Sequence, residues 1–502
     1  MELKLSILVL YVAAMLYLGY VGMRRTKTVG DFFLGGRTIG PWMSAFAYGT
    51  TYFSAVLFVG YAGKLGWGFG PHTLWIVAGN TVVGSLLAWM VLAKRTRIMT
   101  AKLGAMTMPE FFEARYGSRA LRVMSALIIF AFLVPYSASV YMGLSYLFEV
   151  NLGISYVYAL TLMAALTGVY LMMGGYFALT LTDFLRGIVE IFGSIFMVVF
   201  LVNLVGGFGP AWDQAWAISY PGFSQVSLPA IGGVLPEAQF PGWMVLASLV
   251  LITSIGPWGM PQMVQKFYSL KSEKDVTRAM IVATGFALII SFAAYFSGAL
   301  THLFYQAPPI DPSTGKASAD YLMPHLLTEK IPGWASLLML LLVLSASMSS
   351  LSSLVLVSSS SIAIDLYARD ANPKPTPKQT MLLLRALCGL FVLASLVIAL
   401  GKPAFILSLM VISWGAIGGS FVAPYVYGLF LPWANRIGAI AGLLTGLGTA
   451  LTLFILWGEP GVPLAGAVAM IVPMIVLPVV SYATRGTEAR GAKLASSIAT
   501  EG

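Results

Sequence analysis

The fold is decided by the stretch Ser345–Ser353, which reads SASMSSLSS and lies inside an apolar run from about residue 334 to about residue 368. In a helix, successive residues are rotated by about 100°. Six small residues then share one face of this helix, whereas Ser347 and Leu351 lie on the other side. The six residues on the shared face are Ser345, Ala346, Ser349, Ser350, Ser352 and Ser353.

This serine face has two interpretations, close helix packing and a cation site. A single serine in an apolar helix often permits close helix packing and donates to the backbone one turn earlier. Five hydroxyls on one face are costly in hydrocarbon unless they have polar partners. Hydroxyl and carbonyl oxygens are also the ligands that a small hard cation takes when it loses water. The face therefore predicts one wall of a sodium site.

The composition indicates an all-α polytopic membrane protein. The chain has 502 residues, of which 58% are hydrophobic and 10% charged, whereas a soluble protein carries about 25% charged residues. The single cysteine, Cys388, excludes a disulfide framework. No metal cluster, nucleophile motif or catalytic dyad stands out, so we expect no enzyme. The net charge of +10 follows membrane topology and does not indicate nucleic-acid binding.

The apolar pattern predicts about thirteen transmembrane helices in one domain, residues 1–484, followed by a short cytoplasmic tail, 485–502. The predicted spans are roughly 5–23, 40–64, 72–93, 120–148, 155–174, 182–206, 243–262, 277–303, 334–368, 380–400, 404–430, 437–457 and 462–483.

The basic residues orient these spans. With the N-terminus outside, 24 of the 29 lysines and arginines fall on the cytoplasmic side, Lys266 among them. Such a bias is typical of cytoplasmic loops. An odd number of spans then places the C-terminus in the cytoplasm, and we expect a multi-pass protein of the plasma membrane. The five basic residues outside are Lys4, Lys64, Lys316, Lys330 and Lys402.

Two spans are predicted to be broken. The second contains Gly49–Ala55, which is rich in β-branched and small polar residues, and the seventh contains Ser254–Gln262, with two prolines. Prolines remove backbone donors and favour a break, although a simple kink is the alternative. The second and seventh spans are five spans apart in the chain. Because five is an odd number, they cross the membrane in opposite directions. This spacing predicts an inverted five-helix repeat, with solute and ions at the breaks.

Ionisable groups within the spans are few. Asp183, Arg186 and Glu190 share one face of the sixth span. They form either an ion-paired cluster near the cytoplasmic surface or, for Asp183, a cation ligand, because charge at membrane depth usually has a role. Other polar and aromatic side chains either line a solute pocket or pack. These are Asn80, Tyr136, Trp258, Gln262 and Trp414.

The chain resembles the sodium:solute symporter family over about residues 5–483. No single motif is specific, but the set is. The matching stretches are Phe32–Arg37 (FFLGGR), Thr107–Tyr116 (TMPEFFEARY), Gly174–Asp183 (GGYFALTLTD), Ser349–Ser353 running on to Asp365–Tyr367 (DLY), and Trp414-Gly415 with Phe421 and Pro424.

The resemblance implies particular ion ligands. The family's sodium site would be formed by the carbonyls of Thr50, Phe53 and Ala346 and by the hydroxyls of Ser349 and Ser350. Some members hold a second sodium, for which the matching residues here are Asp183, Ser352 and Ser353. Na+ is thus the expected coupling ion, with a stoichiometry of one or two.

The solute remains open at this stage. Where sodium/proline symporters have an acidic residue and a Gly-Trp pair, this chain has Tyr52 and Ala55-Val56, which is closer to the pantothenate and monocarboxylate branch. Tyr136 matches the proline branch. We expect an amino acid such as proline, or a small carboxylate. The candidate pocket residues are Tyr52, Tyr136, Trp258, Gln262 and Trp414.

The resulting interpretation is a sodium-coupled symporter that imports a small organic solute by alternating access. A monomer in the lipid bilayer would suffice, and the oligomeric state stays open. One alternative is a proton-coupled carrier of the same fold with Asp183 or Glu190 as the proton site. Another is a membrane sensor, against which the short tail argues.

Overall fold

The computed structural model describes residues 2–25, 29–173, 176–228 and 238–485. Nearly all of its regular structure is helical. In chain order the helices are α1 (Glu2–Arg25), α2 (Val29–Leu34), α3 (Pro41–Tyr52), α4 (Ala62–Phe69), α5 (Leu74–Gly79), α6 (Lys94–Lys102), α7 (Met108–Tyr116), α8 (Arg119–Leu152), α9 (Tyr156–Met173), α10 (Tyr176–Leu204), α11 (Phe208–Trp216), α12 (Gly242–Ile255), α13 (Pro261–Tyr268), α14 (Asp275–Ala299), α15 (Thr301–Phe304), α16 (Leu322–Glu329), α17 (Gly333–Ile362), α18 (Pro377–Gly401), α19 (Ile406–Phe430) and α20 (Arg436–Ala483).

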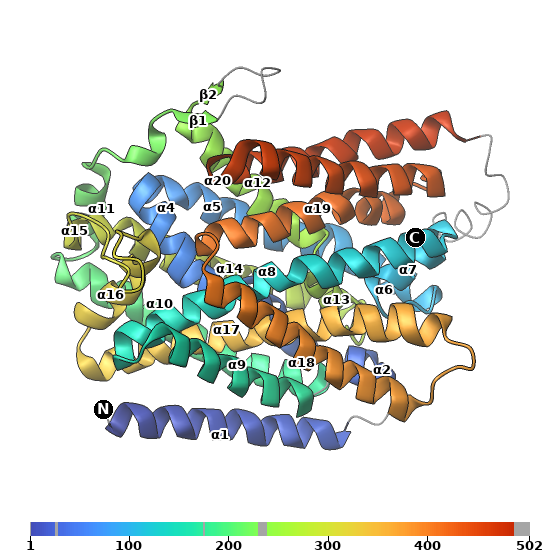
Figure 1. The fold of residues 1–502 in the computed structure, drawn as a ribbon, viewed down its shortest axis with the longest axis horizontal. Helices are drawn as coiled ribbons and strands as arrows, with labels where there is room; N and C mark the ends of the chain where they lie inside the picture. The colour runs from blue at the N-terminus through green and yellow to red at the C-terminus, as the bar shows by residue number, and fades with distance from the viewer. Residues whose placement is uncertain (1, 26–28, 174–175, 229–237, 486–502) are drawn as a thin grey trace.

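The long helices lie side by side along the long axis of the molecule (Figure 1). Within the described residues, nine helical stretches are long and apolar enough to cross a membrane, and two shorter apolar helices accompany them, Ser6–Val21 and Tyr156–Val169. An α-helix satisfies its own backbone polar groups, which lipid cannot do. The chain is therefore a helical polytopic membrane protein, as its composition indicates.

Both predicted breaks are present. Helix α3 ends at Tyr52, Phe53 has an extended backbone (φ −112°, ψ 117°), and a π-helical segment resumes over Val56–Tyr61 before α4. Helix α12 ends at Ile255, and α13 begins only at Pro261. The seventh span thus continues to Tyr268, beyond the predicted limit at residue 262, because α13 carries polar residues that the hydropathy pattern assigned to a loop.

One end of the bundle carries the shorter elements. Helices α11, α15 and α16 cluster there (Figure 1). An antiparallel hairpin of strands β1 (Val226–Leu228) and β2 (Ala238–Phe240) lies at the edge of the bundle beside α20. The hairpin belongs to the long loop between α10 and α12, for which the sequence predicted no strand. Helices α6 and α7 lie toward the opposite end.

Helix α17 runs through the core. It packs against α3, α8, α10 and α18, and every residue from Ser345 to Ser353 is buried. A helix that is buried on all sides is the expected place for polar groups that need protein partners. This position brings its serine face into contact with both broken spans.

Candidate functional site

The break after α3 creates free acceptors beside α17. Proline at the first helical position starts α3, and Gly49, Thr50 and Thr51 near its end are weak helix formers. Because the chain becomes extended at Phe53, the last carbonyls of α3 lose their intrahelical donors. The next segment begins with the Ser54 side chain accepting from the Val56 amide at 3.2 Å.

The serine face of α17 meets these acceptors. The Ser349 hydroxyl donates to Thr50 Oγ1 at 2.7 Å. The Ser350 hydroxyl lies 3.2 Å from both the Thr50 and the Thr51 carbonyl oxygens. The structure therefore brings together three of the five predicted sodium ligands, namely Thr50, Ser349 and Ser350, and all three are fully buried.

The other two predicted ligands lie on the same elements. Phe53 is the extended residue at the break itself, and Ala346 lies one turn before Ser350 on α17; both are buried. We call the set Thr50, Phe53, Ala346, Ser349 and Ser350 the first cation site. The oxygens that this set offers are neutral carbonyl and hydroxyl groups, the kind of donor that a hard cation takes when it loses water.

The three residues predicted for a second sodium are differently engaged. Asp183 on α10 is buried, and its Oδ1 lies 3.6 Å from Arg186 Nη1. Ser352 donates to the Met348 carbonyl of its own helix at 2.6 Å. Ser353 Oγ lies 3.0 Å from Thr51 Oγ1. We call Asp183, Ser352 and Ser353 the second cation site.

A lysine reaches into this second site. Lys266 Nζ donates to Ser353 Oγ at 3.0 Å, and the whole side chain is buried. The sequence placed this lysine in a cytoplasmic loop, and that prediction is wrong. Lys266 belongs to the buried helix α13, because the seventh span is longer than hydropathy indicates.

A small cavity lies beside the α3 break. Its volume is about 20 Å³, which is room for roughly one water molecule. Tyr52 and Trp414 line it, and their rings stack at 6.2 Å between centroids. The Tyr52 hydroxyl is held by the Thr253 carbonyl at 2.5 Å. Two of the five pocket candidates therefore form this wall.

The remaining candidates lie outside the lining. Tyr136 packs edge-on against Trp414 with 6.0 Å between ring centroids. Trp258 donates to the Val83 carbonyl at 3.0 Å. Gln262 is buried, and neither of its amide atoms has a hydrogen-bond partner among the described residues.

The cavity lining also contains residues that were not predicted as a group. Among the described residues, the Tyr61 hydroxyl and Asn80 Oδ1 have no hydrogen-bond partner. Polar groups buried without partners need an explanation, such as a ligand or water. The sequence already pointed to Asn80, because an amide within a predicted span is unusual. It gave no signal for Tyr61 and Tyr295, because aromatic residues within spans usually serve for packing. The additional lining residues are Ser54, Leu57, Tyr61, Thr253, Tyr295 and Met410.

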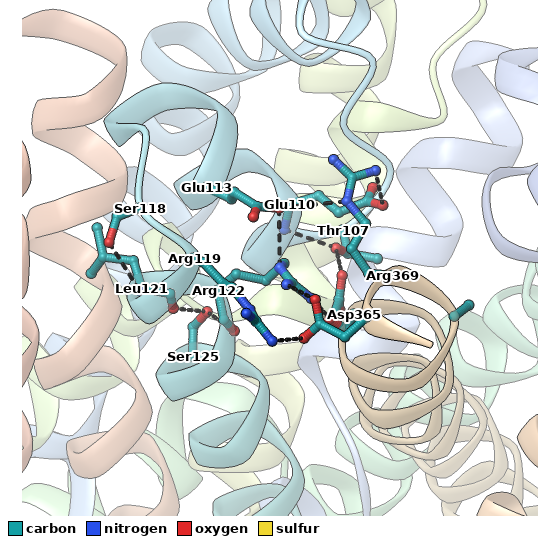
Figure 2. A network of polar contacts seen from close by, with 12 residues as sticks. Thr107, Glu110, Glu113, Ser118, Arg119, Leu121, Arg122, Ser125, Asp365 and Arg369 are labelled. Atoms are coloured by element: carbon teal, nitrogen blue, oxygen red, sulfur yellow. Dashed lines mark hydrogen bonds and ion pairs between the residues drawn. The ribbon is translucent and has the colours of Figure 1, made fainter. Parts of the chain in front are cut away.

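The far end of α17 is held by a polar network (Figure 2). Thr107 caps α7 and donates its hydroxyl to Asp365 Oδ1 at 2.6 Å, in the π-helical turn Ala363–Ala368 that extends α17. Arg122 is buried on α8 and pairs with Glu113 at 3.0 Å and with Asp370 at 2.7 Å.

Further contacts close the same network. Arg122 also donates to the Asp365 carbonyl, and Arg369 Nε lies 3.5 Å from Glu113 Oε2. Because Arg122 is buried and pairs with two carboxylates, these charge-assisted contacts hold more strongly than exposed pairs. The network thus ties α7 and α8 to the end of the helix that carries the serine face.

Comparison with known proteins identifies the family. The profile of the Sodium:solute symporter family matches residues 32–446. The chain belongs to this family. The family indicated by the sequence motifs is thereby confirmed, and the protein is a transporter of the sodium:solute symporter family rather than an enzyme.

The relatives of this symporter include the osmoregulated proline transporter OpuE of Bacillus subtilis, 28% identical over 481 residues, covering 94% of this chain and 92% of the relative. The sodium/proline symporter of Escherichia coli is 28% identical over 454 residues, covering 90% and 87%.

Among solved structures, the symporter is similar to a substrate-bound, outward-open Na+-coupled sialic acid symporter. The TM-score is 0.74 at 20% identity, covering 95% of this chain and 97% of that one. MHP1, a nucleobase-cation-symport-1 transporter, gives a TM-score of 0.53 at 13% identity, covering 93% and 98%. At these identities the likeness concerns the fold.

Proposed function

We propose that this transporter imports a small organic solute together with Na+, which binds at the first cation site. The observation that carries the proposal is the contact between the serine face and the broken helix. There the Ser349 and Ser350 hydroxyls meet Thr50 and Thr51 at 2.7 and 3.2 Å. If a cation bound there, each serine hydroxyl would turn its hydrogen away from the facing oxygen and point a lone pair at the ion. The hydrogen bonds would thus be replaced by contacts between the ion and the oxygens.

The five members of the first site carry no charged side chain, so a cation there would be held by carbonyl and hydroxyl oxygens, which are the ligands that a hard cation takes when it loses water. Sodium binding there would also order the α3 break, so that ion and solute binding are coupled reciprocally.

We propose an amino acid such as proline as the solute, with a small carboxylate as the alternative. The relatives named as proline transporters and the position of Tyr136 against Trp414 support the amino acid. The cavity presents aromatic faces, the Ser54 hydroxyl and the Asn80 amide. The start of the helix after the break lies at this cavity, and a helix N-terminus suits a carboxylate.

The cavity volume of about 20 Å³ is too small for any of these solutes, so solute binding would require the site to widen. Transport by alternating access requires the bundle to open on each side in turn. We propose that the network of Thr107, Arg122 and Asp365 is the inner gate, because it locks the end of α17 to α7 and α8 (Figure 2).

We also propose thirteen crossings and an inverted five-helix repeat with broken second and seventh spans. Two of the nine long stretches have 47 and 48 residues, whereas one crossing needs about 20. The second of them changes direction at Gly458, with φ +60°. If each of these two stretches crosses twice, the nine stretches give eleven crossings. The shorter helices α1 and α9 bring the total to thirteen. The N-terminus would then lie outside and residue 485 inside; the rest of the predicted tail lies outside the described residues.

The experiment is a thermal-shift screen of amino acids, small organic acids and sugars in sodium or potassium buffer, followed by uptake into proteoliposomes. We expect one solute class to stabilise the protein only with sodium, and an inward sodium gradient to drive its uptake. Uptake driven by a pH gradient in sodium-free buffer would instead show a proton-coupled carrier. Binding without uptake would indicate a sensor.

A further inference from the structure

Lys266 carries a buried charge to which the proposed transport cycle gives no role. Its side chain is completely buried on α13, and its Nζ lies 3.0 Å from Ser353 Oγ and 5.1 Å from the centre of the Tyr176 ring. The Asp183 carboxylate is close enough to interact with it electrostatically. A buried ammonium is tolerated only where such groups compensate its charge.

The position of this ammonium is specific. Ser353 Oγ contacts Lys266 on one side and Thr51 Oγ1, at 3.0 Å, on the other. The lysine therefore reaches α3, the first broken helix, through a single hydroxyl of α17. It extends from α13, the second half of the other broken helix. Both breaks are thus linked through Ser353.

The same position competes with a second sodium. Two of the three residues of the second cation site are already engaged. Ser353 accepts a hydrogen bond from the Lys266 ammonium, and Ser352 donates to the Met348 carbonyl of its own helix. The Asp183 carboxylate already faces the guanidinium of Arg186, 3.6 Å from its Oδ1, and the Lys266 ammonium. A sodium would be a third positive charge in this buried place, where the low dielectric does not screen the repulsion. The residues present therefore do not fit a second sodium while Lys266 is in place.

We propose that Lys266 is a built-in cation that replaces the second sodium, so that this transporter moves one Na+ with each solute. The inference rests on the proposed function. The tethered ammonium supplies the positive charge that the Asp183–Ser353 region requires. It does so without an ion from the medium, and the first cation site alone responds to the sodium concentration.

The test measures binding of radiolabelled sodium to the purified full-length chain, which needs no knowledge of the solute. Wild-type protein should bind one sodium per chain with a Hill coefficient of about 1. Lys266→Ala, which leaves space and frees Ser353 from the ammonium, should bind two. Lys266→Arg should again bind one, as should the double variant Lys266→Ala/Asp183→Asn.

The outcomes separate this inference from the proposed function. Two sodium ions on the wild type would overturn the built-in cation and leave sodium coupling intact. No sodium on the wild type would overturn both. A well-folded Lys266→Ala protein that still binds one sodium would overturn the replacement. If that variant does not fold, Lys266→Gln serves in its place, and the wild-type stoichiometry still decides.

Discussion

The two candidate cation sites use the same serine face yet differ in charge. Ser350 and Ser353 lie three residues apart on α17, a rise of about 4.5 Å. The first site meets neutral carbonyl and hydroxyl oxygens of α3, whereas the second meets the ammonium of Lys266 and the carboxylate of Asp183. The first site offers only neutral oxygens to the proposed sodium, whereas the second already contains the Lys266 ammonium.

This difference teaches that a run of similar hydroxyls does not by itself define a run of similar sites. Each serine takes its role from the element that faces it. Ser352 illustrates the third possibility, because its one hydrogen bond among the described residues goes to the Met348 carbonyl of its own helix. The predictions that follow test whether the two sites differ as the contacts indicate.

The largest effect is expected at the charged site. Asp183→Asn should remove the carboxylate that compensates the buried Lys266 ammonium, and removing one partner of a buried pair costs about 3 kcal/mol of unfolding free energy. Thermal denaturation in detergent would measure the loss. Adding Lys266→Met should recover most of it, because the stranded charge is then removed as well.

The matched control for this prediction is Asp213→Asn, which removes an exposed carboxylate of α11 and should leave the stability unchanged. A well-expressed Asp183→Asn protein with wild-type stability would show that Asp183 does not compensate a buried ammonium. The contrast between the two sites would then lose its electrostatic basis.

A smaller effect is expected at the neutral site. Ser350→Ala should raise the sodium concentration for half-maximal uptake by about tenfold, equivalent to about 1.4 kcal/mol, because it removes one neutral ligand and leaves buried acceptors unpaired. Ser349→Ala should act in the same direction. Both variants should reach the membrane in normal amounts, which surface labelling checks.

Ser347→Ala is the control on the same helix, since Ser347 donates only to the Val343 carbonyl at 2.5 Å among the contacts described. Its sodium dependence should match the wild type. An unchanged sodium response in both Ser349→Ala and Ser350→Ala would remove the first site from the proposed mechanism.

A weaker effect on the sodium requirement is expected from a variant that alters the balance of conformations without removing an ion ligand. Thr107→Val removes the hydroxyl that holds Asp365 at the end of α17 but touches neither cation site. Loosening this inner gate should favour the inward-facing form and raise the sodium requirement by about threefold, through the populations alone.

The readout is accessibility of the inner side, measured by labelling a cysteine introduced near the gate, together with the sodium dependence. Thr161→Val, on the exposed face of α9, should change neither quantity. A raised sodium requirement without increased labelling would place the effect in the ligands rather than in the gate.

The last prediction concerns orientation and carries no energetic effect. In a Cys388→Ala background, Ser224→Cys should react with an impermeant reagent in intact cells, and Lys378→Cys should not. Both positions are exposed. The reverse pattern would invert the topology and the side from which sodium reaches the two sites.

The sequence alone determined the helical membrane class, the family and the two breaks. The class and the breaks depend on local chemistry: apolar length, weak helix formers and prolines. The five proposed ligands of the first site come from the resemblance to the family. Of the pocket candidates, the structure places Tyr52 and Trp414 at the cavity.

Only the tertiary structure decided the role of Lys266. In the sequence it follows an apolar run and is followed by more basic residues, as a cytoplasmic loop would be. Packing of α13 against α3 and α17 buries it between Ser353 and Tyr176. A charge is assigned to water or to the core by the groups that surround it in space, because only nearby opposite charge and hydrogen bonds compensate the loss of hydration.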